Sequence, residues 1–205
     1  MNRPPTSVLV ALLAAAVATA ATGQVWLQAT FATVRHPVAL GVANTTADAE
    51  TVRGWYRVLL GQGTLDRMVA TELVDLVWVS GVAATAVLLT VLAARSLERR
   101  NRPAAGVLRR IAPWTALAPG LDLAENGLSL LMLGDPLGFP APLGAAHAAV
   151  SWVKLAAMVG VGVGVPAFWL WSLRGYRGGG RGGRVDLPPR VAPSGPDRRL
   201  AGPDR

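Results

Sequence analysis

Four polar side chains stand in the apolar stretch formed by residues 121–132. They are Asp122, Glu125, Asn126 and Ser129. Their spacings of three and four positions place them on one face of a helix. A charged side chain at the centre of a membrane helix costs about 2.5–3.5 kcal/mol on insertion scales, so it normally faces a protein interior, an opposite charge or a water-filled cavity. We therefore expect this face to line a polar core within a membrane protein.

Two other apolar segments carry charges that could meet this face. Glu72 and Asp75 share a face at the start of residues 68–94, and the only lysine, Lys154, lies in residues 147–173. A rise of about 1.5 Å per residue places most of these groups roughly 9–12 Å below the expected outer surface, with Asp122 deeper, at about 17 Å. The predicted site comprises Glu72, Asp75, Asp122, Glu125, Asn126 and Lys154, with Gln28, Ser129, His147 and Ser151 at its periphery.

Three interpretations of this cluster remain open. In the first, it is a structural network in which Lys154 bonds to Asp75 and Glu125, while Asn126 and Ser129 complete the hydrogen bonds. In the second, it is a binding site, because four carboxylates face one lysine and three of them lack a cation. In the third, Glu125 or Asp122 is a general acid or base.

Several chemistries are disfavoured by residue type. The chain has no cysteine, which excludes disulfides, thiolate metal sites and thiol nucleophiles. A di-iron carboxylate bundle needs Glu-x-x-His pairs, and neither His36 nor His147 belongs to one. We expect no metal and no cofactor, and the sequence assigns no catalytic residue.

The elements that must position the cluster are long apolar helices. Hydrophobic residues make up 52% of the 205 residues, which is too apolar for an ordinary soluble domain. The sequence predicts an all-α bundle of four transmembrane helices within residues 1–173, at about 7–31, 68–94, 111–133 and 147–173. Ala18-Thr19-Ala20 also resembles a signal-peptidase site, so cleavage of the first helix is an alternative. Gly160 and Gly164 predict close helix packing, within one chain or between two.

The longest polar connection, residues 32–68, predicts a short external helix. Thr45 or Thr46 would cap it, and it would run to Gly61. One face of it would carry Val52, Trp55, Tyr56 and Leu59. Such a helix either lies on the membrane surface or packs as a lid on the bundle.

Two arginine-rich segments predict the orientation. Residues 95–110 contain six arginines, and residues 174–205 form an Arg/Gly/Pro-rich tail that we expect to be disordered. The positive-inside rule places both segments, and both termini, on the cytoplasmic side of the cytoplasmic membrane. The tail would bind anionic lipid headgroups or serve only topology and solubility. Nucleic acid is an improbable partner, because no aromatic residue follows Tyr176.

These motifs resemble those of a group of uncharacterised bacterial four-helix integral membrane proteins. The matching residues are Tyr56, Leu60-Gly61, Glu72-Leu73-Val74-Asp75, Asp122-Leu123-Ala124-Glu125-Asn126 and Lys154. The most specific is the intramembrane Asp-x-x-Glu-Asn motif, and the likeness extends over residues 1–173. This chain departs from the group in having Trp55 beside the tyrosine and a long basic tail. The resemblance implies the topology and the polar cluster, and no particular reaction.

The functional expectation is a multi-pass membrane protein that binds a small polar ligand, a lipid headgroup or an ion in its outer half. A proton-coupled small transporter is one alternative, and a membrane enzyme with an intramembrane carboxylate is another. The bilayer is the expected partner, and the sequence does not determine an oligomeric state.

Overall fold

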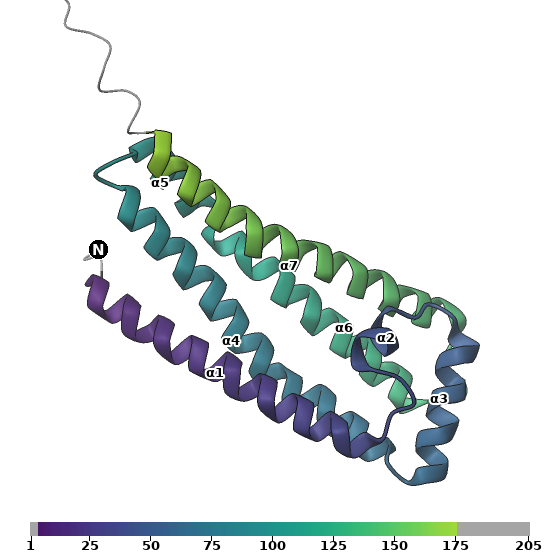
Figure 1. The fold of residues 1–205 in the computed structure, drawn as a ribbon. Coiled ribbons are helices and arrows are strands. Elements are labelled where there is room, and N and C mark those ends of the chain that lie inside the picture. Colours follow the sequence, from purple (N-terminus) through teal and green to yellow (C-terminus); the bar gives the residue numbers. More distant parts are fainter. Residues whose placement is uncertain (1–3, 176–205) are drawn as a thin grey trace, which may run out of the picture.

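The computed structural model describes residues 4–175, and within that range the chain forms helices and no strands (Figure 1). The elements are α1 (Thr6–Val34), α2 (Leu40–Thr45), α3 (Ala49–Gln62), α4 (Leu65–Leu97), α5 (Arg102–Ile111), the 3₁₀ helix η1 (Ala112–Ala116), α6 (Leu117–Gly134) and α7 (Ala141–Gly175). Three of them, α1, α4 and α7, are long and apolar enough to cross a membrane. The protein is therefore an all-α, multi-pass membrane protein. The predicted disordered tail lies, from residue 176 onward, outside the described residues.

The most extensive helix pair of the bundle is α1 packed along α4, with α1 at the edge of the bundle (Figure 1). Two glycines permit this close approach. A Cβ atom at Gly23 would lie 2.7 Å from the backbone nitrogen of Trp78, and one at Gly81 would lie 2.4 Å from the backbone nitrogen of Ala20. Backbone atoms cannot move aside easily, so these two positions require glycine.

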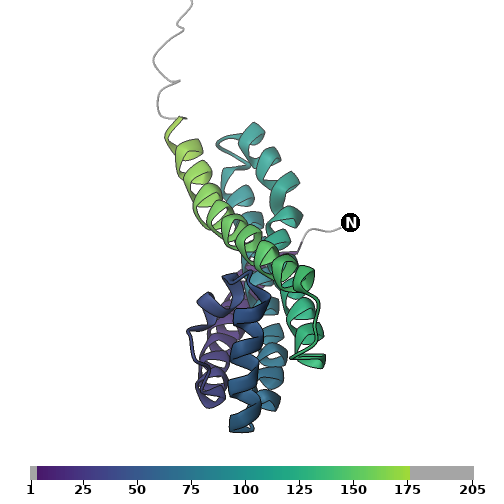
Figure 2. The ribbon, with the colours of Figure 1, turned by 90° about the vertical axis from the view of Figure 1, so that its right-hand side faces the viewer.

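The other long helices extend from this pair on one side only. Helix α4 also contacts α6, and α6 contacts α7, whereas α1 and α7 have no extensive contact. Helix α7 runs obliquely across the bundle (Figure 2). The helices therefore form an open bundle, and the gap in their packing lies between α1 and α7.

The helix boundaries differ from prediction most clearly around the arginine-rich segment. It contains α5, which the sequence interpretation missed. The Asn101 side chain caps α5 by accepting a hydrogen bond from Ala104 N at 3.1 Å, and Pro103 occupies the first turn. The predicted third helix was expected to begin at residue 111, but this residue ends α5, η1 follows it, and α6 begins only at Leu117.

Helices α2 and α3 cover the end of the bundle where α1 ends and α4 begins, called here the capped end (Figure 1). The predicted cap of α3 was wrong. Asp48, rather than Thr45 or Thr46, accepts a hydrogen bond from Thr51 N at 3.0 Å. The two threonine hydroxyls instead donate to backbone carbonyls one turn earlier, within and beside α2. Sequence alone favoured the threonines because both residue types can cap a helix.

The apolar face of α3 packs into the bundle as a lid. Val52, Tyr56 and Leu59 are buried in a cluster that also includes Met68 of α4 and Met132 of α6. This contact favours the second of the two predicted arrangements of this helix. It also holds α3 at the capped end, next to the polar residues Glu72 of α4 and Ser129 of α6.

A second apolar cluster lies at the opposite end, called here the arginine end. The buried face of α5 packs against Ala94 and Leu97 of α4. Arg95 Nη1 donates to the Pro4 carbonyl oxygen at 2.8 Å, and Trp169 Nε1 donates to Ser96 Oγ at 2.8 Å. Both described ends of the chain therefore lie at the arginine end.

The predicted packing role of Gly160 and Gly164 was wrong within the described chain. A Cβ atom at either position would meet no atom within 4 Å. These glycines lie on an exposed part of α7, so they do not draw two helices of this chain together.

Candidate functional site

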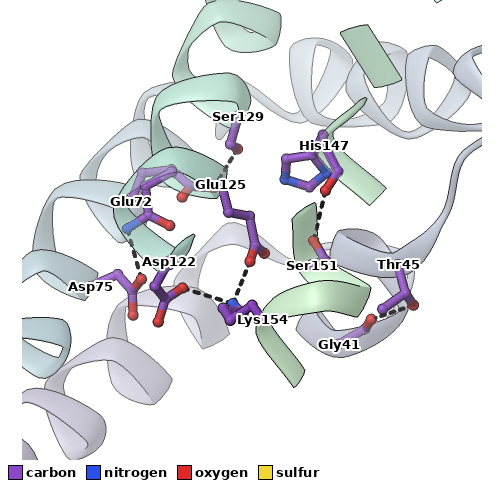
Figure 3. Close-up of polar contacts among 11 residues, drawn as sticks. Gly41, Thr45, Glu72, Asp75, Asp122, Glu125, Ser129, His147, Ser151 and Lys154 are labelled. Atoms are coloured by element: carbon purple, nitrogen blue, oxygen red, sulfur yellow. Dashed lines mark hydrogen bonds and ion pairs between the residues drawn. The ribbon is translucent and has the colours of Figure 1, made fainter. Parts of the chain in front are cut away.

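A buried ion-pair cluster joins α6 to α7 (Figure 3). The ammonium of Lys154 lies 2.7 Å from Asp122 Oδ1 and also pairs with Glu125 Oε2. Both carboxylate residues are only 1% exposed, and Lys154 is 9% exposed. Desolvation of these three charges is costly, so each carboxylate depends on the shared cation.

The partners of Lys154 differ from those predicted, because Asp122 takes the place of Asp75. The difference follows from the true boundaries of α7. This helix begins at Ala141, six residues before the predicted start at His147. Counted from the helix ends at the capped end, Lys154 is then about 20 Å deep and Asp122 about 18 Å deep. The two groups lie at one level, and the earlier start of α7 accounts for their meeting.

The two acids of α4 have neutral partners (Figure 3). Ser129 Oγ donates to Glu72 Oε1 at 2.6 Å, and Asn126 Nδ2 donates to Asp75 Oδ2 at 2.7 Å. Both donors were predicted members of the cluster, and both come from α6. Since Lys154 is engaged by Asp122 and Glu125, no cation pairs with Glu72 or Asp75 within residues 4–175.

A cavity of about 340 Å³ extends beside this cluster. Its walls come from α1, α2, α4, α6 and α7. The predicted residues that line it are Glu72, Asp75, Asp122, Asn126, Lys154, Gln28 and Ser151. Glu125, Ser129 and His147 do not line it, although they remain buried beside it. The cavity thus exposes three of the four carboxylates to any bound molecule.

Two buried carboxylate oxygens lack a hydrogen-bond donor in the described part of the chain. They are Asp122 Oδ2 and Glu125 Oε1. The Ser151 hydroxyl lies near Glu125, but it donates its single proton to the His147 carbonyl oxygen at 3.0 Å. A buried polar atom without a partner carries a cost of about 1–3 kcal/mol, more for a charged group. Because Asp122 lines the cavity, a bound molecule is a source of the missing donor for that residue.

On the side toward the capped end, α3 closes the cluster. Tyr56 lies beside Glu72 and Ser129, and it shares a void of only about 10 Å³ with Ser129 and His147. Burial, reinforced by the nearby Glu72 carboxylate, raises the pKa of the Tyr56 phenol above its ordinary value. Tyr56 therefore keeps its proton and seals this side with a neutral polar group.

The sequence interpretation missed several residues of the cavity wall. They are Gln24, Asn44, Thr71 and Trp78. A signal existed for three of them. Gln24 lies one turn before Gln28, and Thr71 and Trp78 lie four residues before and three residues after Asp75, and so on its helix face. Asn44 had no comparable signal, since it belongs to the six-residue helix α2, which the sequence did not predict.

The cluster does not have the geometry of a metal site. In the range from residue 4 to residue 175, no three His, Asp or Glu side chains come close enough together to hold a metal ion. Comparisons of the chain with protein-family models, with curated proteins and with solved structures found no match.

Proposed function

We propose that the protein is a membrane-embedded binding protein that holds a small, positively charged organic ligand in the cavity between α1, α4, α6 and α7. One observation carries this proposal: Glu72 and Asp75 line the cavity and receive hydrogen bonds from neutral groups only. A cation placed beside them would supply the counter-charge that the chain itself directs to Asp122 and Glu125.

The size and lining of the cavity suit a small organic molecule. Its volume of about 340 Å³ lies at the lower end of the range of roughly 300–1,000 Å³ that is typical of ligand sites. Trp78 adds an aromatic ring to the wall near Asp75, and aromatic rings attract organic ammonium groups. The absence of three convergent carboxylates within the described residues favours an organic cation over a metal ion.

The orientation of this site follows from two further elements of the proposal. Helix α6, with 18 residues, is about 27 Å long, close to the roughly 30 Å of a bilayer's hydrocarbon core, and we assign it as the fourth span. The arginines of α5 place the arginine end in the cytoplasm of the cell whose cytoplasmic membrane holds the protein. The capped end, with α2 and α3, then faces outward, and the cavity extends from the outer side, near Glu72, to beyond the middle of the membrane, at Asp122 and Lys154.

The test compares a small amine with its neutral counterpart. The protein in nanodiscs is examined with butylamine and with butanol by saturation-transfer difference NMR. We expect a signal for the amine that falls about tenfold or more in Asp75→Asn and Glu72→Gln, because each loses a charge interaction worth at least ~1.4 kcal/mol. Asp66→Asn, an exposed change in the same helix, is the matched control and should leave the signal unchanged.

Two outcomes would contradict the proposal. The first is an equal response to butylamine and butanol. The second is an amine signal that survives both carboxamide substitutions. Each variant keeps an oxygen that can accept the existing hydrogen bond from Asn126 or Ser129, so loss of fold should not obscure the result. Circular dichroism of each variant verifies this.

A proton-coupled transporter is the second candidate. The observation that favours it is that the acids without a cation, Glu72 and Asp75, line the cavity, so a proton and a cationic substrate would compete for the same carboxylates. Uptake of butylamine into proteoliposomes under an imposed pH gradient tests it. Flux that depends on the gradient and disappears in Asp75→Asn would support transport, whereas binding without any flux would exclude it.

A further inference from the structure

We propose that the ligand is an amphiphile, a long-chain amine whose ammonium group binds at Glu72 and Asp75 and whose alkyl chain lies in an apolar groove between α4 and α7. This inference rests on the proposed function, since it assigns the chemical class of the cation that the cavity would hold.

The groove begins one helical turn from the charged cavity, on the same three helices. The cavity is lined by Trp78, Asp122 and Leu155. One turn farther from the capped end, a second cavity of about 300 Å³ is lined by Val82, Ala118 and Met158, among others that are apolar except for three threonines, Thr85, Thr90 and Thr115. Polar and apolar walls therefore follow each other along one line, as the head and tail of an amphiphile require.

The groove continues toward the arginine end. A third cavity, of about 350 Å³, shares Leu89, Val165 and Pro166 with the second and extends to Trp169. Trp169 lies 15 positions after Lys154 in α7, which corresponds to about 22 Å. One leaflet of a bilayer is about 15 Å thick in its hydrocarbon region, so the groove is long enough to hold one alkyl chain.

The open side of the bundle gives such a molecule a route from the membrane. Helices α1 and α7 have no extensive contact, and the charged cavity has walls from both. Residues Gly41, Asn44 and Thr45 of α2 cover the cavity on the side of the capped end. An amphiphile that already resides in the bilayer would therefore enter between α1 and α7 with its chain still in an apolar medium.

Charge decides which amphiphile fits. Any lipid chain could occupy an apolar groove in a bilayer, but four carboxylates with a single ammonium among them would repel a headgroup with a net negative charge, such as a carboxylate or a phosphate that carries no ammonium group. Asp122, at 1% exposure, also has an oxygen without a hydrogen-bond partner beside the cavity. A protonated amine supplies both the positive charge and the donors.

The experiment separates the chain from the headgroup. Binding of butylamine, octylamine and dodecylamine to the protein in nanodiscs is measured with correction for uptake by empty nanodiscs. The groove is filled in Gly162→Leu, where an added Cβ meets no atom within 4 Å, so the change should not disturb the fold. Gly164→Leu is the matched control, because it has equally open surroundings and does not line the groove.

We expect Gly162→Leu to weaken dodecylamine binding at least fivefold and to leave butylamine binding unchanged, while Gly164→Leu leaves both unchanged. If butylamine binds in a manner that needs Asp75 but dodecylamine is indifferent to Gly162→Leu, the amphiphile inference fails and the proposed function stands. If no amine binds, both fail. Dodecanol that binds as tightly as dodecylamine would also overturn the inference.

A final arm identifies the source of the amine. Dodecylamine binding is repeated in nanodiscs of phosphatidylglycerol alone and in nanodiscs that also contain phosphatidylethanolamine. Competition by phosphatidylethanolamine would support the inference and identify a membrane lipid as the ligand. Unchanged binding would support it with a free long-chain amine as the ligand.

Discussion

Replacing Lys154 by methionine removes the only cation of the buried cluster while retaining a long apolar side chain. Two carboxylate residues of 1% exposure, Asp122 and Glu125, then lose their counter-charge. Breaking a buried ion pair from one side costs about 3–5 kcal/mol, because the remaining charge stays buried without compensation. We expect Lys154→Met to lower the free energy of unfolding by that amount.

The assay compares this variant with a triple variant that removes all three charges. In Lys154→Met/Asp122→Asn/Glu125→Gln no ionised group remains at the pair, and replacing a complete buried ion pair is often close to neutral. The free energy of unfolding is measured in bicelles by titration with sodium dodecyl sulfate, with tryptophan fluorescence as the signal. The triple variant should recover most of the loss seen in the single variant.

Two results would refute this reasoning. A loss below about 1 kcal/mol in Lys154→Met would place the pair in the range of solvent-exposed salt bridges, so water in the adjoining cavity would be screening it. A triple variant no more stable than the single variant would show that the ammonium's packing, rather than its charge, holds α6 to α7.

Three further predictions concern the frame around the site. Gly81→Ala should lower the free energy of unfolding by about 1–3 kcal/mol, because its Cβ has no room beside α1, while Gly127→Ala should have no such cost. Arg53→Met should lower the free energy of unfolding by roughly 1.5–3 kcal/mol, because the Arg53 guanidinium donates a hydrogen bond to the Phe139 carbonyl oxygen at 2.7 Å. Unfolding by urea or detergent measures the loss in Gly81→Ala and in Arg53→Met. Burial lowers the pKa of His36 below its ordinary value of 6.5, so as the pH falls the unfolded state binds this proton before the folded state does. The free energy of unfolding should therefore decrease as the pH is lowered from about 7 to about 5. His36→Leu should remove the part of this decrease that His36 causes.

The polar face of α6 could be predicted because its cause is local. Spacings of three and four place Asp122, Glu125, Asn126 and Ser129 together, and charges within an apolar segment must find polar neighbours. The partner of Lys154 could not be predicted in the same way. It depends on where α7 begins. Pro142 in the first turn is a helix-start signal, but the glycines and prolines just before it indicated a turn-rich loop and obscured the start at Ala141.

Longer-range features had weaker signals still. Helix α5 was hidden because six arginines in 95–110 suggested a loop, although Asn101 followed by Pro103 is a helix-start pattern. Gly23 and Gly81 make the close contact between α1 and α4, yet the glycines that drew attention, Gly160 and Gly164, have open surroundings. Spacing identifies a small residue on a face, but it does not say whether another helix faces it.

Helix α7 is attached to the rest of the bundle in two regions along its length. It is attached at the arginine end by the hydrogen bond from Trp169 to Ser96, and toward the capped end by contacts with α2 and α3 and by the ion pairs of Lys154 with α6. Between these supports lie three glycines and Pro166, residues that weaken a helix, and two of the four, Gly162 and Pro166, line the groove. The middle of α7 can therefore bow outward while both attachments hold, and the space beneath it can adjust to the thickness of what it holds without the bundle coming apart.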